Sequence, residues 1–233
     1  MGGRVLVVDT STPAGSVALC EDGRVLAEYF RRLPGTHTDW LLAAVDRLLA
    51  DAGTTLGELS LLAVVQGPGS FTGLRVGIAT VKGLAMAAGL PVIGLSSLEL
   101  LAAAVPFARM PVCALLDARK KEVYAALFDT ANGLPVPLGV ERVLPPERLA
   151  GELDGDILFV GEGAEVYRAF LAKRLGARAH FAGAAFQLPR ASFGGRLALA
   201  KEAAGEAVSA AVLRPVYIRS SEAELARKGG VAC

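Results

Sequence analysis

The chain has 233 residues, of which 53% are hydrophobic, and its formal net charge is +1. This length can bury a substantial apolar core in one large or two small domains. No apolar run reaches the roughly 18 residues that cross a bilayer, because Gly, Pro and charged residues interrupt every stretch. The balanced charge and the lack of Lys/Arg-rich segments exclude a stand-alone nucleic-acid-binding protein, so another chain should hold any RNA involved.

The cysteines and the N-terminus indicate the compartment. Cys20, Cys113 and Cys233 are odd in number and widely spaced, which excludes a disulfide framework and a CxxC zinc site. The opening residues place a short apolar run against Asp9, unlike the longer apolar stretch of a signal peptide. We therefore expect a cytoplasmic protein with no membrane association.

The first hundred residues predict three strands, a helix, a strand, a helix, a strand and a helix. Strands are expected where apolar residues lie between turn residues, and helices where apolar residues recur every three or four positions. The expected strands are 4–9, 15–20, 24–31, 61–66 and 91–95. The expected helices are 38–52, ended by Gly53, then 72–88 and 97–104.

A second unit is expected to begin at Pro111. Its strands are predicted at 112–117, 122–128 and 157–160, with a short helix before the last strand and another helix after Gly161-Glu162-Gly163. Four prolines predict an irregular segment at 134–147. Residues 191–204 are expected to be helical, and the tail 222–233 to be frayed.

These two units each begin with a strand meander and continue with helices, which predicts a duplicated α/β fold with two subdomains around a cleft. This order resembles the actin-like ATPase fold of actin, Hsp70 and sugar kinases, which is ribonuclease H-like. The first subdomain is expected at 1–108, with 190–220 packing back on it, and the reduced second subdomain at 109–189.

The turn after the first strand contains Asp9, Thr10 and Ser11. Hydroxyls and free backbone N–H groups in such a turn can hold a phosphate, and the carboxylate can hold a metal through water. An ordinary structural turn explains the same residues. Both interpretations stay open at this point.

A glycine-rich loop leads into the helix at 72–88. Gly67, Gly69 and Ser70 lie where unsatisfied N–H groups of a helix N-terminus attract anions. The loop is neither a Walker A motif nor a dinucleotide-binding fingerprint. A tight strand-to-helix turn is the alternative explanation.

The helices at 38–52 and 72–88 carry apolar and small residues on more than one face, which fits either core helices or a docking face for a partner helix. The candidate interface residues are Trp40, Leu41, Val45, Leu48, Thr72, Arg75, Val76, Ala79 and Leu84.

The two histidines, His37 and His180, are isolated in the sequence. They form no HxxxH, HExxH or serine-hydrolase arrangement, which argues against a metalloprotease or a Ser-His-Asp hydrolase. We expect His37 to cap the following helix or to lie on the surface.

Several motifs in order resemble the TsaB (YeaZ-type) family over nearly the whole chain. They are VDTS at 8–11, HTDWLL at 37–42, QGPGSFTGLRVGIATVKGLA at 66–85, DARKKEVYAALF at 117–128 and RPVYIR at 214–219. The resemblance implies a noncatalytic paralogue of TsaD, which transfers threonylcarbamoyl to tRNA adenosine. Where TsaD-like chains carry a metal-binding HxxxH, this chain has Ser97 and Leu101, and Leu has no lone pair for a metal. The implied role is that of a scaffold or activating subunit, with no metal site and no catalysis of the transfer.

The resemblance also implies partners. A TsaB-like chain pairs with TsaD through the two helices, meets the ATPase TsaE in a larger complex, forms a homodimer when alone, and reaches tRNA only through the complex.

No cofactor is expected to be required, and ATP or ADP should bind this chain weakly, at the TsaD interface, or not at all. The degenerate phosphate-loop positions are Asp9, Thr10, Ser11, Gly67, Gly69, Ser70, Asp117 and Arg119. An active small-molecule kinase or ATPase of the same fold is the alternative. A glycopeptidase is a third reading, which no metal or nucleophile arrangement supports.

Overall fold

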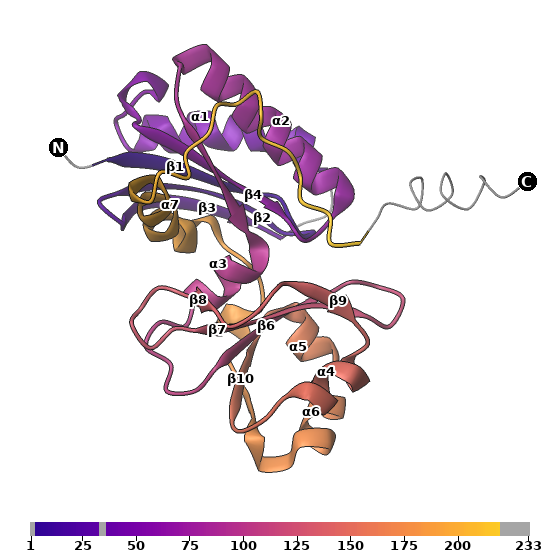
Figure 1. Ribbon diagram of the computed structural model, residues 1–233. Coiled ribbons are helices and arrows are strands. Elements are labelled where there is room, and N and C mark those ends of the chain that lie inside the picture. Colours follow the sequence, from indigo (N-terminus) through magenta and orange to yellow (C-terminus); the bar gives the residue numbers. More distant parts are fainter. Residues whose placement is uncertain (1–2, 33–35, 220–233) are drawn as a thin grey trace, which may run out of the picture.

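A computed structural model describes residues 3–32 and 36–219, and two α/β units stand one above the other in it (Figure 1). The tail predicted to fray, 222–233, lies outside the described residues. Among the described helices, none is long and apolar enough to cross a membrane.

The first unit is built on a five-stranded sheet in the order β3-β2-β1-β4-β5. Its strands are β1 Arg4–Asp9, β2 Gly15–Glu21, β3 Arg24–Arg31, β4 Leu61–Gly67 and β5 Val92–Ser96. The meander β1-β2-β3 is antiparallel, whereas β4 and β5 continue parallel to β1. Both faces are covered, because α1 (Leu41–Asp51) and α2 (Phe71–Ala88) share one core cluster with the sheet and α7 (Gly194–Ala203) shares another.

The second unit repeats this topology. Read from its other edge, its sheet order is β8-β7-β6-β10-β11, and in this order the direction of each pairing is the same as in β3-β2-β1-β4-β5. A sixth strand, β9, pairs with β7 outside this order. The strands are β6 Val112–Asp117, β7 Val123–Asp129, β8 Val136–Pro137, β9 Arg142–Leu144, β10 Ile157–Val160 and β11 Ala179–Phe181. The helices are α4 Pro146–Glu152, α5 Glu162–Val166 and α6 Arg168–Leu175. The predicted duplication is confirmed.

Helix α3 (Ser97–Ala103) joins the two units. Leu100 belongs to the core of the first unit, and the next residue, Leu101, belongs to the core around β6, β7 and β10. The remaining short turns are 3-10 helices at His37–Asp39, Leu56–Glu58, Gly176–Arg178, Ala184–Phe186 and Ala191–Phe193.

Two sequence predictions of local structure need correction. The segment 134–147 is not wholly irregular, because β8 and β9 both pair with β7 there. The helix predicted at 38–52 is interrupted: Trp40, at φ −128°, separates the 3-10 turn from α1. Its end is as predicted, since Gly53 adopts the left-handed conformation, at φ +59°.

Candidate functional site

The turn between β1 and β2 is sealed by the start of α2. Thr10 is fully buried, and its hydroxyl donates to the carbonyl of Gly73 over 2.8 Å. The amide of Ser70 donates to the carbonyl of Ser11 over 2.7 Å. A Cβ on Gly73 would lie 2.1 Å from the Thr10 carbonyl oxygen, so only glycine allows this approach. The predicted phosphate-loop hydroxyl of Thr10 is therefore engaged within the chain.

Asp9 lies beneath this turn with no exposed surface. One carboxyl oxygen, Oδ1, accepts a hydrogen bond from the Ser11 amide over 2.9 Å. Within the described part of the chain, Asp9 Oδ2 and the buried Ser11 hydroxyl have no hydrogen-bond partner. Burial raises the pKa of the Asp9 carboxyl to about 6, because a low-polarity surrounding disfavours the charged form.

A cleft of about 310 Å³ separates the two units. It is lined by Ser11, Thr12, Pro13, Gly69, Ser70 and Phe71 from the first unit and by Leu116, Asp117, Ala118, Arg119, Tyr124 and Glu162 from the second. The structure thus brings five predicted positions together: Ser11, Gly69, Ser70, Asp117 and Arg119. Asp9 and Thr10 do not line the cleft, and Gly67 packs elsewhere, against the carbonyl of Val216.

Acidic groups face the cleft from the second unit. Asp117 forms an ion pair with Arg119 over 3.5 Å. Burial and the nearby charge of Asp117 raise the pKa of Glu162. Sequence reasoning missed Glu162 and Tyr124, although the Gly161-Glu162-Gly163 helix start was a usable signal.

The tip of the β6–β7 hairpin has an unusual backbone. Arg119, Lys120 and Lys121 have φ values of +61°, +52° and +61°, a left-handed conformation that costs non-glycine residues about 1–2 kcal/mol each. Arg119 lines the cleft, and its side chain is 79% exposed.

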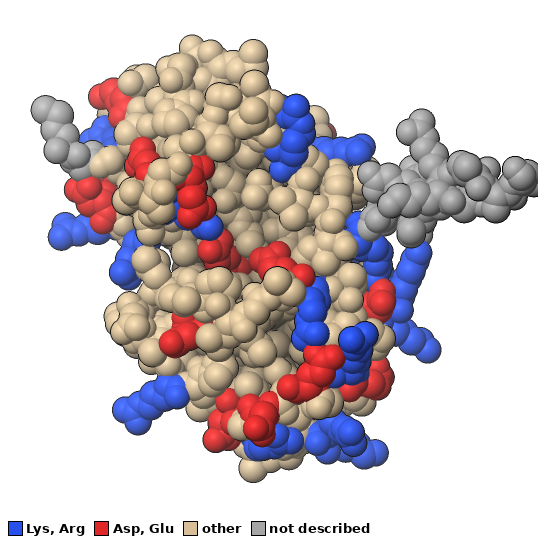
Figure 2. All heavy atoms as spheres, in the orientation of Figure 1, with Lys and Arg blue, Asp and Glu red and all other residues tan. Residues whose placement is uncertain are grey.

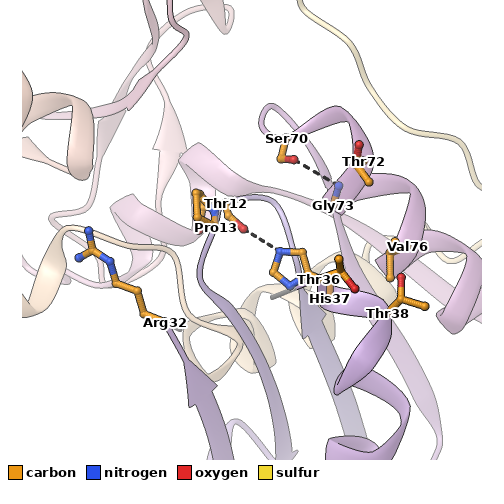
Figure 3. A pocket seen from close by; sticks show the side chains of 10 residues that line it. All are labelled: Thr12, Pro13, Arg32, Thr36, His37, Thr38, Ser70, Thr72, Gly73 and Val76. Carbon is orange, nitrogen blue, oxygen red and sulfur yellow. Dashed lines mark hydrogen bonds between the residues drawn. The ribbon is translucent and has the colours of Figure 1, made fainter. Parts of the chain in front are cut away.

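A second hollow, of about 540 Å³, lies on the first unit beside the β1–β2 turn (Figure 3). Five threonine and serine side chains contribute to its lining, while Arg32 extends away from the other residues. His37 is half-buried there, and its Nε2 lies 2.9 Å from the carbonyl oxygen of Thr12. His37 therefore ties the loop before α1 to the β1–β2 turn rather than lying freely on the surface.

Ser97 and Leu101, which the resemblance sets at the positions of the metal-binding histidines, are both buried. The Ser97 hydroxyl donates to the carbonyl of Pro68 over 2.5 Å. Leu101 packs closely against Gly161, since a Cβ on that glycine would lie only 2.8 Å from Leu101 Cδ1. A hydroxyl already engaged and an aliphatic side chain do not fit a metal ion.

Three of the candidate interface residues are not on the surface. Leu41, Val45 and Leu48 are 1%, 2% and 0% exposed and belong to the core between α1 and the sheet. Their helical spacing marks the core face, so the prediction that Leu41 and Leu48 offer a surface to a partner needs correction, whereas Val45 also lines the open groove described below. Thr72, Arg75 and Ala79 are exposed, and Trp40, Val76 and Leu84 are half-buried.

Helices α1 and α2 also carry exposed apolar residues, which lie away from the faces that these helices turn to the core. Leu42 on α1 is 59% exposed and Met86 on α2 is 74% exposed. An open groove of about 570 Å³ lies beside Leu42. It is lined by Leu42, Ala43, Val45, Asp46, Leu49, Leu56 and Leu84. Leu42 could have been noticed in the sequence, because it is an apolar residue that does not share the helical spacing of the core residues Leu41, Val45 and Leu48.

Comparison with known proteins places this architecture in a family. Residues 33–227 match the family model of TsaD, tRNA N6-adenosine threonylcarbamoyltransferase. The tRNA threonylcarbamoyladenosine biosynthesis protein TsaB of Bacillus subtilis is 33% identical over 228 residues, which cover 94% of this chain and 96% of that protein.

Solved structures agree. YeaZ from Pseudomonas aeruginosa superposes with a TM-score of 0.81 at 38% identity, over 92% of this chain and 99% of that one. The ROK hexokinase of Thermus thermophilus, at 15% identity and a TM-score of 0.50 over 85% of this chain and 99% of that one, shares the actin-like ATPase fold. The chain therefore belongs to the TsaB (YeaZ-type) branch of the TsaD-like family.

Proposed function

We propose that this chain serves tRNA threonylcarbamoyladenosine synthesis as a noncatalytic subunit that docks on TsaD through α1 and α2. The modified nucleoside is the adenosine next to the anticodon of tRNAs that read codons beginning with A. The apolar groove beside Leu42 and Leu84 carries the proposal, because an open apolar surface on paired helices fits a partner helix. The same groove is proposed to receive a second copy of the chain, forming a homodimer when TsaD is absent.

The noncatalytic part of the proposal is supported by side chains already in use. Thr10 bonds within the chain, Ser97 bonds to Pro68, and Leu101 fills a core position. The chain is therefore proposed to activate or hold TsaD, with TsaE joining the assembly and tRNA contacting it through the complex.

Nucleotide is proposed to bind this chain weakly or to lie at the TsaD interface. The small volume of the cleft supports this, as does its charge: two carboxylates, of Asp117 and Glu162, face one guanidinium, of Arg119, among the lining residues. Calorimetric titration with ATP and Mg²⁺ separates this proposal from the kinase alternative: dissociation constants of about 1 μM or below would favour a kinase.

The docking proposal is tested with Leu42→Glu, because Leu42 is exposed and its replacement spares the core. Burial of an unpaired carboxylate at a helix interface costs about 3 kcal/mol, which weakens the affinity for TsaD roughly a hundredfold. Val166→Glu is the matched control, since Val166 is also 59% exposed but lies on the second unit.

Association is measured by light scattering and calorimetric titration with purified TsaD. Unchanged affinity for TsaD in Leu42→Glu would place the interface elsewhere. A loss in both variants would indicate a nonspecific effect of charge. A variant at Leu41 cannot serve, because a carboxylate there would disrupt the core.

A further inference from the structure

The last described segment, residues 205–219, forms a strap across the first unit (Figure 1). It begins along the open edge of the sheet, where Val208 and Val92 exchange two backbone hydrogen bonds of 2.9 Å. Leu213 is 3% exposed and joins the core cluster of α1 and α2. Lys82 of α2 donates to the strap carbonyl of Leu213 over 3.4 Å. The strap is thus an integral part of the first unit.

Its far end is fixed to the first turns of α2. The Tyr217 ring stacks on Phe71 with 4.8 Å between ring centroids. Arg75 donates from Nε to the Tyr217 hydroxyl over 3.1 Å, and its guanidinium carbon lies 3.8 Å from the centre of the Phe71 ring. Position and orientation of Tyr217 are therefore set by α2.

Two residues further on, the strap crosses to the second unit. Arg219 donates from Nη1 to the carbonyl of Ala118 over 2.7 Å and forms an ion pair with Glu122 through Nη2. The Arg219 and Glu122 side chains are 23% and 32% exposed. Both partners of Arg219 belong to the β6–β7 hairpin that carries Asp117 and Arg119 into the cleft.

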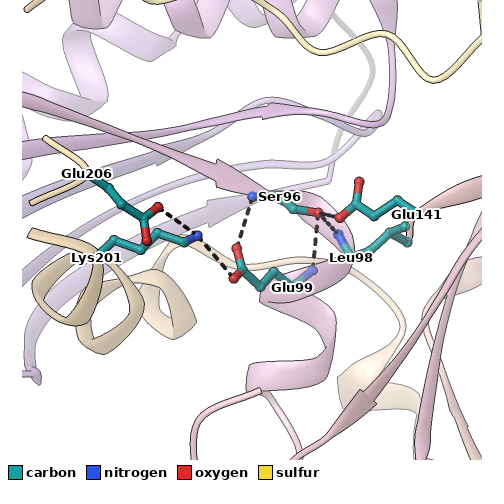
Figure 4. Close-up of polar contacts among 6 residues, drawn as sticks. All are labelled: Ser96, Leu98, Glu99, Glu141, Lys201 and Glu206. Carbon is teal, nitrogen blue, oxygen red and sulfur yellow. Dashed lines mark hydrogen bonds and ion pairs between the residues drawn. The ribbon is translucent and has the colours of Figure 1, made fainter. Parts of the chain in front are cut away.

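A second polar contact crosses between the units at α3 (Figure 4). The Ser96 hydroxyl donates to the carboxylate of Glu141, from the loop between β8 and β9, and accepts from the amides of Leu98 and Glu99. Glu99 is held by Lys201 of α7 over 3.3 Å. The Ser96–Glu141 contact lies beside α3, which joins the two units. Arg219 contacts the hairpin that lines the cleft, where a rotation of one unit about α3 would cause a larger displacement.

We propose that the strap is a lock that holds the two units at one angle, with Arg219 as its closing contact, and that it couples the position of α2 to the cleft. An Arg with two directed hydrogen bonds, one of them to a carboxylate, is suited to this because its planar group fixes direction as well as distance. A partner on α2 would then act on the cleft through Tyr217 and Arg219. This last step rests on the proposed function, whereas the lock does not.

The lock is tested by electron–electron distance measurements on the isolated full-length chain. Spin labels are attached at Ala50→Cys on α1 and Ala172→Cys on α6, two exposed positions on different units. Cys233→Ser removes the tail thiol, while Cys20 and Cys113 are fully buried and their pKa values are raised by burial to about 11 and about 12, so neither reacts. Excess unlabelled protein suppresses distances between copies.

The parent should give one narrow distance distribution, and Arg219→Ala should broaden it and extend it to longer distances. Arg214→Ala is the matched control, because this substitution removes the same charge from the same strap. Arg214 donates only to carbonyls within the strap, those of Ala211 and Leu213, among the hydrogen bonds of the described residues. Glu122→Gln, which preserves side-chain shape, should broaden the distribution from the other side of the contact.

A parent-like distribution in both Arg219→Ala and Glu122→Gln overturns the lock. Tyr217→Ala tests the coupling: it should release the hairpin as Arg219→Ala does, and a parent-like distribution would show that Arg219 acts independently of α2. Because TsaD is absent from these measurements, failure of TsaD binding leaves their outcome unaffected.

Discussion

Asp9 combines complete burial with a carboxyl oxygen that lacks a partner among the described residues. Its pKa is raised from 3.8 to about 6, so the folded state keeps its proton to higher pH than the unfolded state does. The free energy of unfolding should therefore fall as pH rises from about 4 through 6, by roughly 3 kcal/mol for this group.

Asp9→Asn should stabilise the protein at pH 7.5 and have little effect near pH 4, because the neutral amide carries no ionisation cost. Urea unfolding at both pH values measures this difference. Asp129→Asn is the control, since Asp129 is exposed and its Oδ1 accepts an amide two residues on, as Asp9 Oδ1 does. An equal effect of Asp9→Asn at both pH values would contradict the account.

For single residues, the sequence indicates which residue types lie in one turn, but not which of their polar atoms already have hydrogen-bond partners within the chain. The motif at Asp9 to Ser11 was visible, yet it gave no sign that the Thr10 hydroxyl would bond to Gly73. That contact joins residues 63 positions apart, and local patterns contain no information about it.

Helix α2 shows how the position of a glycine decides its role. Gly77 faces the β1–β2 turn, where a Cβ would lie 2.3 Å from the Thr10 hydroxyl, whereas a Cβ on Gly83 would meet nothing within 4 Å. Gly77→Ala should destabilise the protein by about 2 kcal/mol through overpacking. Gly83→Ala should stabilise it by about 0.5–1 kcal/mol through helix propensity.

Chemical denaturation of the two variants compares the same substitution at two sites on one helix. If both substitutions stabilised the protein, α2 could move away from Thr10 without cost. That result would contradict the close packing of α2 on the β1–β2 turn.

Strands and helices with strong apolar patterns were predictable, because burial on both faces gives β1 and β4 continuous apolar runs. The short β8 and β9 were not, because the four prolines in and around them favoured an irregular segment; Pro137 is tolerated because β8 is an edge strand. The spacing of apolar residues along α1 was also predictable. It does not show what these residues contact, and Leu41, Val45 and Leu48 pack against the sheet of their own unit.

At the scale of the whole molecule, α3 contributes consecutive residues to two cores. Leu100→Ala should speed hydrogen exchange mainly in β1 and β4, and Leu101→Ala mainly in β6, β7 and β10, because each substitution leaves a cavity in one cluster. Exchange followed by mass spectrometry resolves the two patterns. Identical patterns for the two variants would show that the units open as one.

The duplication was predictable from the repeated meander, but the identical strand order was not, because pairings between distant strands leave no local mark in the sequence. Nor did composition reveal the contact of Arg219 with Glu122, which joins residues 97 positions apart.

The strap and α7 have a consequence for protein synthesis. Leu197 and Ala198 complete the core on one face of the first sheet, and Val208 covers the edge of β5. When the ribosome has added residue 189, every strand of the second unit exists, while that face and that edge of the first sheet are still bare. The second unit can therefore fold before the first is finished, and the nascent chain carries an open sheet edge until its final segments emerge.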